Sequence, residues 1–227
     1  MQIQVVTGEG QQIADPFLVR LGGWTEERYF AEAPEDRLWE FQDGELIVHS
    51  PATPGHQRLV GFLTFLLRGY VEERGLGEVF NGPAVLRLRP GADKEPDIFF
   101  LHRDRRDQVG RARVEGPADL VIEVTSPGTR SYDLGEKAQG YREGGVAEYW
   151  GIDPERRAVT IHRPSAGLGR PELVEGRAGQ PEYRAAMIQT GRLESTAVGG
   201  FWAYVEWLWL DPLPSGPECL RQVVGET

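Results

Sequence analysis

A nearly continuous apolar run, interrupted late by one carboxylate, constrains the fold of this chain more than any other feature. The run extends from Asp119 to Val124, and Glu123 is the residue that interrupts it. A strand with one solvated face alternates polar and apolar residues, whereas a strand covered on both faces is apolar throughout. The run therefore predicts a strand inside a covered sheet, with an acid near its end.

Helix-like and strand-like segments alternate around this run. Asp43-Gly44 lies between two strand-like segments, 38–42 and 45–49, and predicts a hairpin because a tight primed turn needs positive φ. Thr53-Pro54 predicts the start of a helix whose apolar residues recur at helical spacing up to Tyr70. The following segments predict a strand pair within 79–88, a strand over 97–101, a helix over 131–142 and strands over 146–152 and 158–162.

The order of these segments indicates the fold class. From 56 to 152 it is helix, strand, strand, strand, helix, strand, which predicts an α/β fold with a central mixed sheet flanked by helices. Residues 102–117 are expected to form a loop, and 164–181 a loop or short hairpin. The aromatic segment 201–209 predicts a packed helix or an interface, with at least half of it in the core.

Chain length and the apolar segments limit the number of domains and the possible membrane association of the chain. With 227 residues, we expect a single domain over 1–227, with a core at about 38–163, an N-terminal arm at 1–37 and a C-terminal extension at 164–227. No secretory signal is recognisable, and the most apolar stretch, 201–210, is too short to cross a bilayer. Cys219 is the only cysteine, which excludes an intrachain disulfide and a cysteine-rich zinc cluster. We therefore expect a cytoplasmic protein that does not associate with membranes.

Net charge limits the kinds of partner. A formal charge of −10 argues against a simple nucleic-acid-binding module, since phosphate binding usually requires a basic surface. It does not exclude an enzyme whose acids hold a divalent cation beside a phosphate. Arginines also gather locally, and both a phosphate-binding surface and a solvated loop surface are open for them; they are Arg87, Arg89, Arg103, Arg105, Arg106, Arg111 and Arg113.

Two acids interrupt or open apolar strands and are candidate metal ligands. Asp97 precedes one strand, and Glu123 lies near the end of another. If these strands are neighbours, both carboxylates converge at one edge of the sheet, where Mg²⁺ or Mn²⁺ would find the oxygen ligands it prefers. The alternative is structural, with Asp97 capping a turn and Glu123 in an ion pair.

Lys137 is the candidate cation of the same site. It shares one face of the predicted helix with Asp133 and Tyr141, each four residues away. Its ammonium could orient or deprotonate a water, or stabilise charge on a phosphate. The alternative is an exposed Asp133–Lys137 pair. Of the 25 Lys and Arg residues only Lys94 and Lys137 are lysine, which suggests that a compact ammonium is needed where lysine is kept.

Four segments carry a family resemblance. They are 95–97 (EPD), 120–127 (LVIEVTSP), 132–137 (YDLGEK) and 141–150 (YREGGVAEYW). Together they resemble the Uma-type family, which is grouped with the PD-(D/E)XK, or restriction-endonuclease-like, superfamily. The resemblance covers roughly residues 38–163, and it implies the same order of core helices and strands that the pattern predicts.

The resemblance also implies a function and a set of site residues. Asp97 would be the Pro-Asp acid and Glu123 the second acid. Thr125 occupies the position where the superfamily pattern has its lysine, so that Lys137 on the next helix would take its role. Glu40, Glu45, His56 and Tyr141 are candidates for outer contacts to the site or the substrate: Glu40 or Glu45 could add a ligand or orient a water, and His56 could contact a phosphate. The alternatives are solvent-facing hairpin acids and a helix-terminal histidine.

The implied activity is Mg²⁺- or Mn²⁺-dependent hydrolysis of nucleic-acid phosphodiesters. We expect DNA as the substrate and a product that carries a 5′-phosphate. The expected assembly is a homodimer or a higher homo-oligomer. Two alternatives remain. One is a binding or scaffold protein that keeps the nuclease fold without efficient turnover, and the other is a hydrolase of smaller phosphodiesters.

Overall fold

A six-stranded mixed sheet forms the centre of the protein. The computed structural model describes residues 16–33, 38–165 and 183–225. The strand order is β12 (Tyr183–Ile188), β11 (Ala158–Pro164), β10 (Glu148–Asp153), β9 (Leu120–Val124), β7 (Ile98–His102) and β4 (Gly77–Asn81). β9 and β10 are parallel, and every other neighbouring pair is antiparallel. The predicted α/β class with a central mixed sheet is therefore confirmed.

A second sheet contains the predicted hairpin. Its order is β1 (Leu18–Gly22), β3 (Glu45–His49), β2 (Trp39–Gln42), β6 (Ala92–Lys94), β5 (Leu86–Arg89) and β8 (Val114–Glu115). Asp43 and Gly44 both adopt positive φ, at 46° and 90°, as a primed turn requires. Within the predicted N-terminal arm, β1 pairs with β3, and α1 (Glu26–Glu32) precedes the hairpin.

Two details of the predicted strand order are wrong. The expected strand pair within 79–88 does not form, because β4 pairs with β7 in the central sheet whereas β5 pairs with β6 and β8 in the second sheet. Gly82-Pro83 leads the chain from one sheet to the other instead of turning it back. Residues 102–117 are not simply a loop, since Arg103–Gln108 form a 3-10 helix and Val114 begins β8.

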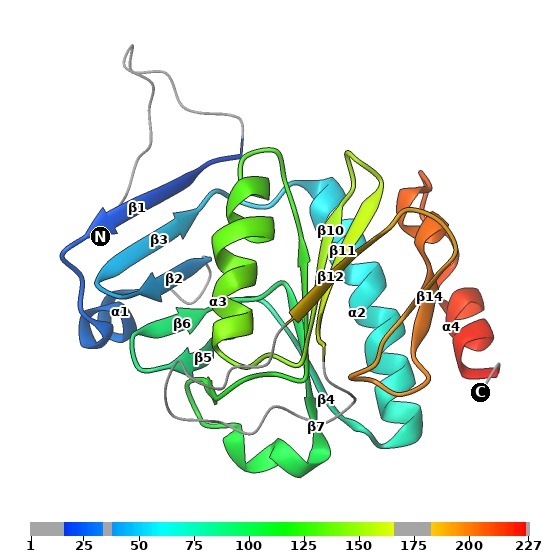
Figure 1. Cartoon of the computed structure of the whole chain (residues 1–227), viewed down its shortest axis with the longest axis horizontal. Helices are drawn as coiled ribbons and strands as arrows, with labels where there is room; N and C mark the ends of the chain where they lie inside the picture. The colour runs from blue at the N-terminus through cyan, green and yellow to red at the C-terminus, as the bar shows by residue number, and fades with distance from the viewer. Residues whose placement is uncertain (1–15, 34–37, 166–182, 226–227) are drawn as a thin grey trace.

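Helices cover both faces of the central sheet (Figure 1). α2 (Pro54–Arg74) packs on one face and begins with Thr53 as its cap, as predicted, and Gly75 with φ 60° ends it. On the other face lies a π-helical turn, Tyr132–Lys137, which continues into α3 (Ala138–Glu143). In Figure 1, α3 lies between the second sheet and the central sheet.

The C-terminal residues pack against α2. β13 (Arg192–Glu194) pairs with β14 (Trp202–Tyr204), a 3-10 helix covers Val205–Trp209, and α4 (Gly216–Gly225) ends the described chain. The helix expected over 201–209 is thus a short strand followed by a 3-10 turn, in keeping with the β preference of Trp, Tyr and Val. The expected core share is confirmed, since five of these nine residues are buried: Phe201, Trp202, Ala203, Val205 and Leu208. Of the loop expected over 164–181, residues 166–181 lie outside the described residues.

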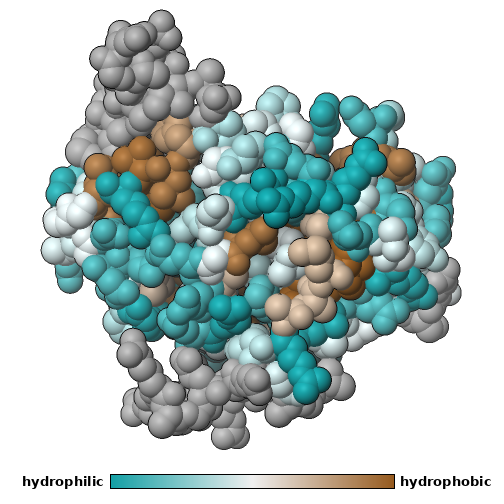
Figure 2. Space-filling model, turned by 45° about the horizontal axis from the view of Figure 1, so that its top comes forward, coloured by the Kyte–Doolittle hydropathy of each residue, from teal (hydrophilic) through white to brown (hydrophobic). Residues whose placement is uncertain are grey.

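Hydrophobic side chains on the face drawn in Figure 2 gather in separate patches between hydrophilic ones. Over the residues that the structure describes, no helix is both long and apolar enough to cross a membrane.

Candidate active site

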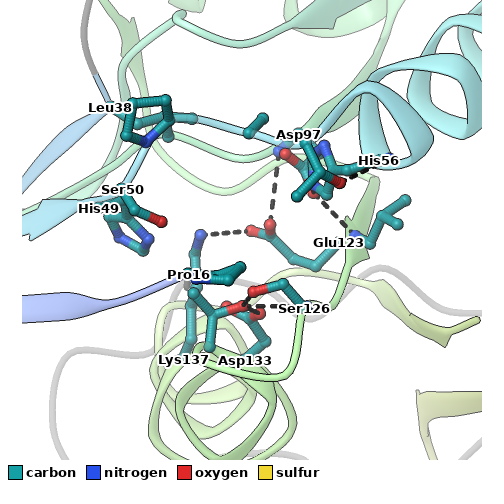
Figure 3. A pocket seen from close by; sticks show the side chains of 15 residues that line it. Pro16, Leu38, His49, Ser50, His56, Asp97, Glu123, Ser126, Asp133 and Lys137 are labelled. Carbon is teal, nitrogen blue, oxygen red and sulfur yellow. Dashed lines mark hydrogen bonds and ion pairs between the residues drawn. The ribbon is translucent and has the colours of Figure 1, made fainter. Parts of the chain in front are cut away.

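The two predicted acids meet because the strands that carry them are antiparallel neighbours. Ile98 on β7 lies opposite Ile122 on β9, so the start of β7 adjoins the end of β9. The backbone N–H of Val124 donates to Asp97 Oδ2 at 2.8 Å, and that of Asp97 lies 3.5 Å from Glu123 Oε2. Asp97 and Glu123 therefore face one another at one end of the central sheet (Figure 3).

His56 orients Asp97. Its Nε2 lies 3.1 Å from Asp97 Oδ2, and it is presented by the first turn of α2, where Thr53 Oγ1 accepts from the His56 backbone N–H. Burial raises the pKa of Asp97, but the hydrogen bond and charge of His56 outweigh it, so the pKa lies below its ordinary value. For His56 burial lowers the pKa, while Asp97 raises it and prevails. The pair therefore favours an ionised Asp97.

Lys137 lies between two carboxylates. Its Nζ is 2.8 Å from Glu123 Oε1 and 2.8 Å from Glu40 Oε1, and the Tyr141 hydroxyl donates to Glu123 Oε1 at 2.7 Å. Burial lowers the pKa of Lys137, yet Glu123 and Glu40 raise it well above its ordinary value. Burial raises the pKa of Glu123, which Lys137 opposes and Asp97 reinforces, and the net shift is upward. This end of the sheet therefore holds a charged ammonium beside the acid pair.

Glu40 connects the second sheet to this cluster. It is fully buried on β2, and its Oε2 accepts from the Tyr132 hydroxyl at 2.7 Å and lies 3.5 Å from Lys94 Nζ. Burial raises its pKa, but Lys137 and Lys94 lower it well below the ordinary value. Glu40 is therefore a buried anion between the two lysines.

A π-helical turn brings two of the Glu40 partners together. The Ala138 N–H donates to Asp133 O, five residues earlier, which marks the π turn. Tyr132 and Lys137 are five residues apart and both contact Glu40. Such turns occur frequently at functional sites.

A pocket opens beside the cluster (Figure 3). Its wall includes Asp97, Glu123, Lys137 and His56, and Figure 3 shows His49 and Ser50 on the side of the second sheet. The remaining lining residues come from the segment before β1, the residue before β2, the β3–α2 connection and the residues from β9 to the π turn: Pro16, Leu38, Pro51, Ala52, Thr53, Val124, Ser126, Thr129 and Asp133. A ligand in this pocket would contact both carboxylates and the ammonium.

The donor set suits a hard divalent cation. Asp97 and Glu123 offer carboxylate oxygens, and Mg²⁺ commonly takes one or two carboxylates and completes its shell with waters and substrate phosphate oxygens. Among the described residues, no group of three or more His, Cys, Asp or Glu side chains is arranged to hold a metal. Asp97 and Glu123 alone would leave most of the shell of Mg²⁺ or Mn²⁺ to water and substrate, and they are fewer ligands than a closed zinc site needs.

Several predicted features lie elsewhere. Glu45 is part of the surface, where its Oε2 pairs with Arg20 at 2.9 Å, and it does not line the pocket. The alternative of an exposed Asp133–Lys137 pair is excluded, since both residues are buried and Asp133 accepts from Thr129.

The clustered arginines are offset by acids. Arg103, Arg105 and Arg106 follow the end of β7 that is remote from Asp97. Ion pairs join arginines of this group to neighbouring acids: Arg105–Asp119, Arg106–Glu78, Arg87–Glu26, Arg89–Asp43 and Arg113–Glu115. Both observations favour the solvated-surface interpretation over a phosphate-binding surface.

Three site residues had no assigned role from the sequence. Lys94, Tyr132 and His49 all lie within the cluster or its wall. The rarity of lysine marked Lys94, but its partner Glu40 is 54 residues away, on a different strand. No periodicity within one element could have joined them.

A mixed sheet with two acids at adjoining strand ends, and a lysine on the next helix, places the protein among restriction-endonuclease-like proteins. Residues 26–189 match the Uma2 family, described as "Putative restriction endonuclease", and the chain belongs to that family.

A solved structure agrees with this assignment. The crystal structure of "a putative nuclease belonging to DUF820 from Anabaena variabilis ATCC 29413" is 14% identical, with a TM-score of 0.64, and the match covers 82% of this chain and 97% of that one. At this identity the likeness shows a shared fold. The comparison with curated proteins found no match. The family and the fold together support a nuclease.

Proposed function

We propose that this protein is a metal-dependent endonuclease that hydrolyses DNA phosphodiester bonds at the pocket formed by Asp97, Glu123 and Lys137. The observation that carries the proposal is the convergence of the buried Glu123 and Lys137 with the largely buried Asp97, from β9, the π turn and the residue before β7, on one pocket wall. Burying charged groups costs several kcal/mol each unless they are paired, so such a cluster at a pocket is a candidate functional site.

Each side chain has a distinct role under this proposal. Asp97 and Glu123 would hold Mg²⁺ or Mn²⁺, which when bound polarises the scissile phosphate and lowers the pKa of a bound water. Lys137, held between two carboxylates, would donate to a phosphate oxygen or to the attacking water. His56 orients Asp97, and Tyr141 orients Glu123. Oriented ligands reduce the rearrangement that the reaction requires.

The distribution of charge supports turnover over simple binding. A module that only binds nucleic acid needs an uncompensated basic surface, and the net charge here is −10 with the clustered arginines largely ion-paired. Asp97 and Glu123 line the pocket, where carboxylates would hold a cation that assists the reaction.

End-labelled oligonucleotides test the activity and the substrate. We would incubate single- and double-stranded DNA and RNA of one sequence with the protein and Mg²⁺, Mn²⁺, Ca²⁺ or EDTA. We expect cleavage of DNA with Mg²⁺ or Mn²⁺, no cleavage with EDTA, and products that carry a 5′-phosphate and can be joined by DNA ligase. Cleavage that persists in EDTA, or cleavage of RNA alone, would contradict the proposal.

A further inference from the structure

Both lysines of the chain contact the same buried carboxylate. Lys94 and Lys137 are the only lysines in 227 residues, and the side chains of both are at most 2% exposed. Lys94 Nζ lies 3.5 Å from Glu40 Oε2, whereas Lys137 Nζ lies 2.8 Å from Glu40 Oε1. Each lysine thus faces a different oxygen of Glu40.

We infer that Lys94 is a positioning residue of the nuclease site, which acts through Glu40 to hold Lys137 against Glu123. This inference rests on the proposed function. It adds a second lysine, from the second sheet, to the machinery assigned to the central sheet.

The contacts of Lys94 fix its position. Its ammonium donates to Gln42 Oε1 and to the Tyr132 hydroxyl at 2.8 Å, and that hydroxyl donates in turn to Glu40 Oε2 at 2.7 Å. Lys94 and Tyr132 therefore lie at Oε2 of Glu40, with His49 Nε2 3.7 Å from the same oxygen, whereas Oε1 faces Lys137 and the Glu95 backbone N–H at 3.3 Å. A carboxylate held at one oxygen is fixed in orientation, so its second oxygen determines where Nζ of Lys137 lies.

Neutralising Glu40 does not by itself require Lys94. Lys137 already lies 2.8 Å from Glu40, and the two would form a neutral pair. With Lys94 added, two ammonium groups share one carboxylate, and the unit retains one positive charge. Glu40 then competes less with Glu123 and with a substrate phosphate for the charge of Lys137.

Burial opposes this arrangement. It lowers the pKa of Lys94, although Glu40 acts in the opposite direction. Keeping a lysine in such a place costs stability. A benefit to function would account for its retention there.

A double-mutant cycle tests the kinetic part. With duplex DNA and Mg²⁺, we expect Lys94→Met to lower kcat about 10- to 100-fold, as outer-shell substitutions commonly do, with KM changed less than about two-fold. In a Glu40→Gln background, the same substitution should have no further effect, because the path through Glu40 is already broken. Equal fold losses of kcat in both backgrounds would overturn the inference.

Lysine-selective NMR tests the structural part without metal or substrate. Protein labelled with ¹³C and ¹⁵N only in lysine gives signals from two side chains, and the one lost in Lys94→Met assigns the other to Lys137. We expect the Lys137 Cε and Nζ signals to move in Lys94→Met. Tyr132→Phe removes the hydroxyl between Lys94 and Glu40 and should also move the Lys137 signals, so it tests the same path if Lys94→Met does not fold.

A matched control separates this effect from general loss of packing. Tyr70→Phe removes the hydroxyl of a buried tyrosine on α2 that donates to Gly199 O at 2.9 Å, apart from the contacts of Lys94 and Glu40. It should leave kcat and both lysine signals unchanged. Lys137 signals that stay at their wild-type positions in Tyr132→Phe would contradict the inference. Wild-type protein that cuts no DNA would instead contradict the proposed function. The NMR result would still test whether Lys94 positions Lys137 through Glu40.

Discussion

Single charged side chains at the site are buried, which costs free energy, and nearby charged or polar groups offset that cost. Glu40 and Lys137 have almost no contact with water, and each is stabilised only by charged or polar neighbours. Removing one member of a buried pair typically costs about 3–5 kcal/mol, since its partner is left uncompensated. Substitutions here therefore need folding measured beside activity, and isosteric changes are preferable to truncation to alanine.

His162, outside the site, offers a pH test of a single residue. Its Nδ1 accepts from Arg142 at 2.9 Å, and burial together with Arg142 lowers its pKa to about 4. The unfolded chain then takes up a proton between pH 6.5 and 4 that the folded chain does not. The free energy of unfolding therefore falls as pH drops through this window, by at most about 3 kcal/mol.

His162→Asn removes this titration while its amide oxygen can still accept from Arg142. We expect urea denaturation between pH 7 and 4 to show a smaller loss of stability in the variant than in the wild type. Parallel stability profiles for the two proteins over that range would show that His162 does not titrate as described.

A site residue could be predicted from the sequence when the pattern of its own helix or strand marks it. Asp97 and Glu123 were predictable because each acid stands out against an apolar strand, and neighbouring strands bring their ends together. Lys137 was predictable from helical spacing and the family resemblance. Tyr132 was not, since α-helical periodicity does not place residues five apart on one face, and only the π turn does so. The prediction of a strand pair within 79–88 was wrong for a similar reason, because the sheet that a strand joins depends on partners distant in sequence.

Glu148 joins two elements, β10 and the turn that follows β13. Its Oε2 accepts from four donors of this turn: the Ser195 and Thr196 hydroxyls and the backbone N–H groups of Thr196 and Ala197. Its Oε1 accepts from Trp150 and Arg163. Glu148→Gln must turn an amide N–H₂ toward one of these donor sets and leaves Arg163 without a counter-charge there, so we expect a loss of about 2–4 kcal/mol in urea denaturation.

The same substitution at Glu155 serves as a control. Glu155 is 54% exposed and pairs with Arg130 at the surface. Its change to Gln should alter stability by less than about 0.5 kcal/mol. Equal losses at positions 148 and 155 would contradict the anchoring role of Glu148.

The whole molecule has one main core that includes the C-terminal residues. α2 lies between the central sheet and the C-terminal elements (Figure 1), and buried residues of all three form one cluster. Chain length and composition predicted a single domain but could not show this, because sequence patterns do not indicate which element 190–225 packs against. The expected homo-oligomer stays a prediction, which light scattering in solution would test.

Two leucines in this region provide a matched test of core membership. Leu208 is 4% exposed in the main core, and Leu210 is 51% exposed. We expect Leu208→Ala to lower the free energy of unfolding by roughly 2–4 kcal/mol, and Leu210→Ala by less than about 0.5 kcal/mol. Thermal and urea denaturation would measure both, and similar effects at the two positions would show that the C-terminal residues are not part of the main core.

Cleavage of supercoiled plasmid DNA by site variants tests the assigned active site most directly. Wild type would be compared, in Mg²⁺ and in Mn²⁺, with Asp97→Asn, Lys137→Met and the surface control Asp104→Asn, which lies beyond the far end of β7. Circular dichroism would confirm that each variant is folded. We expect nicking or linearisation by wild type and Asp104→Asn, and a loss of at least about 100-fold in both site variants. Cutting by folded Asp97→Asn or Lys137→Met at the wild-type rate, or an inert wild type, would contradict the assignment.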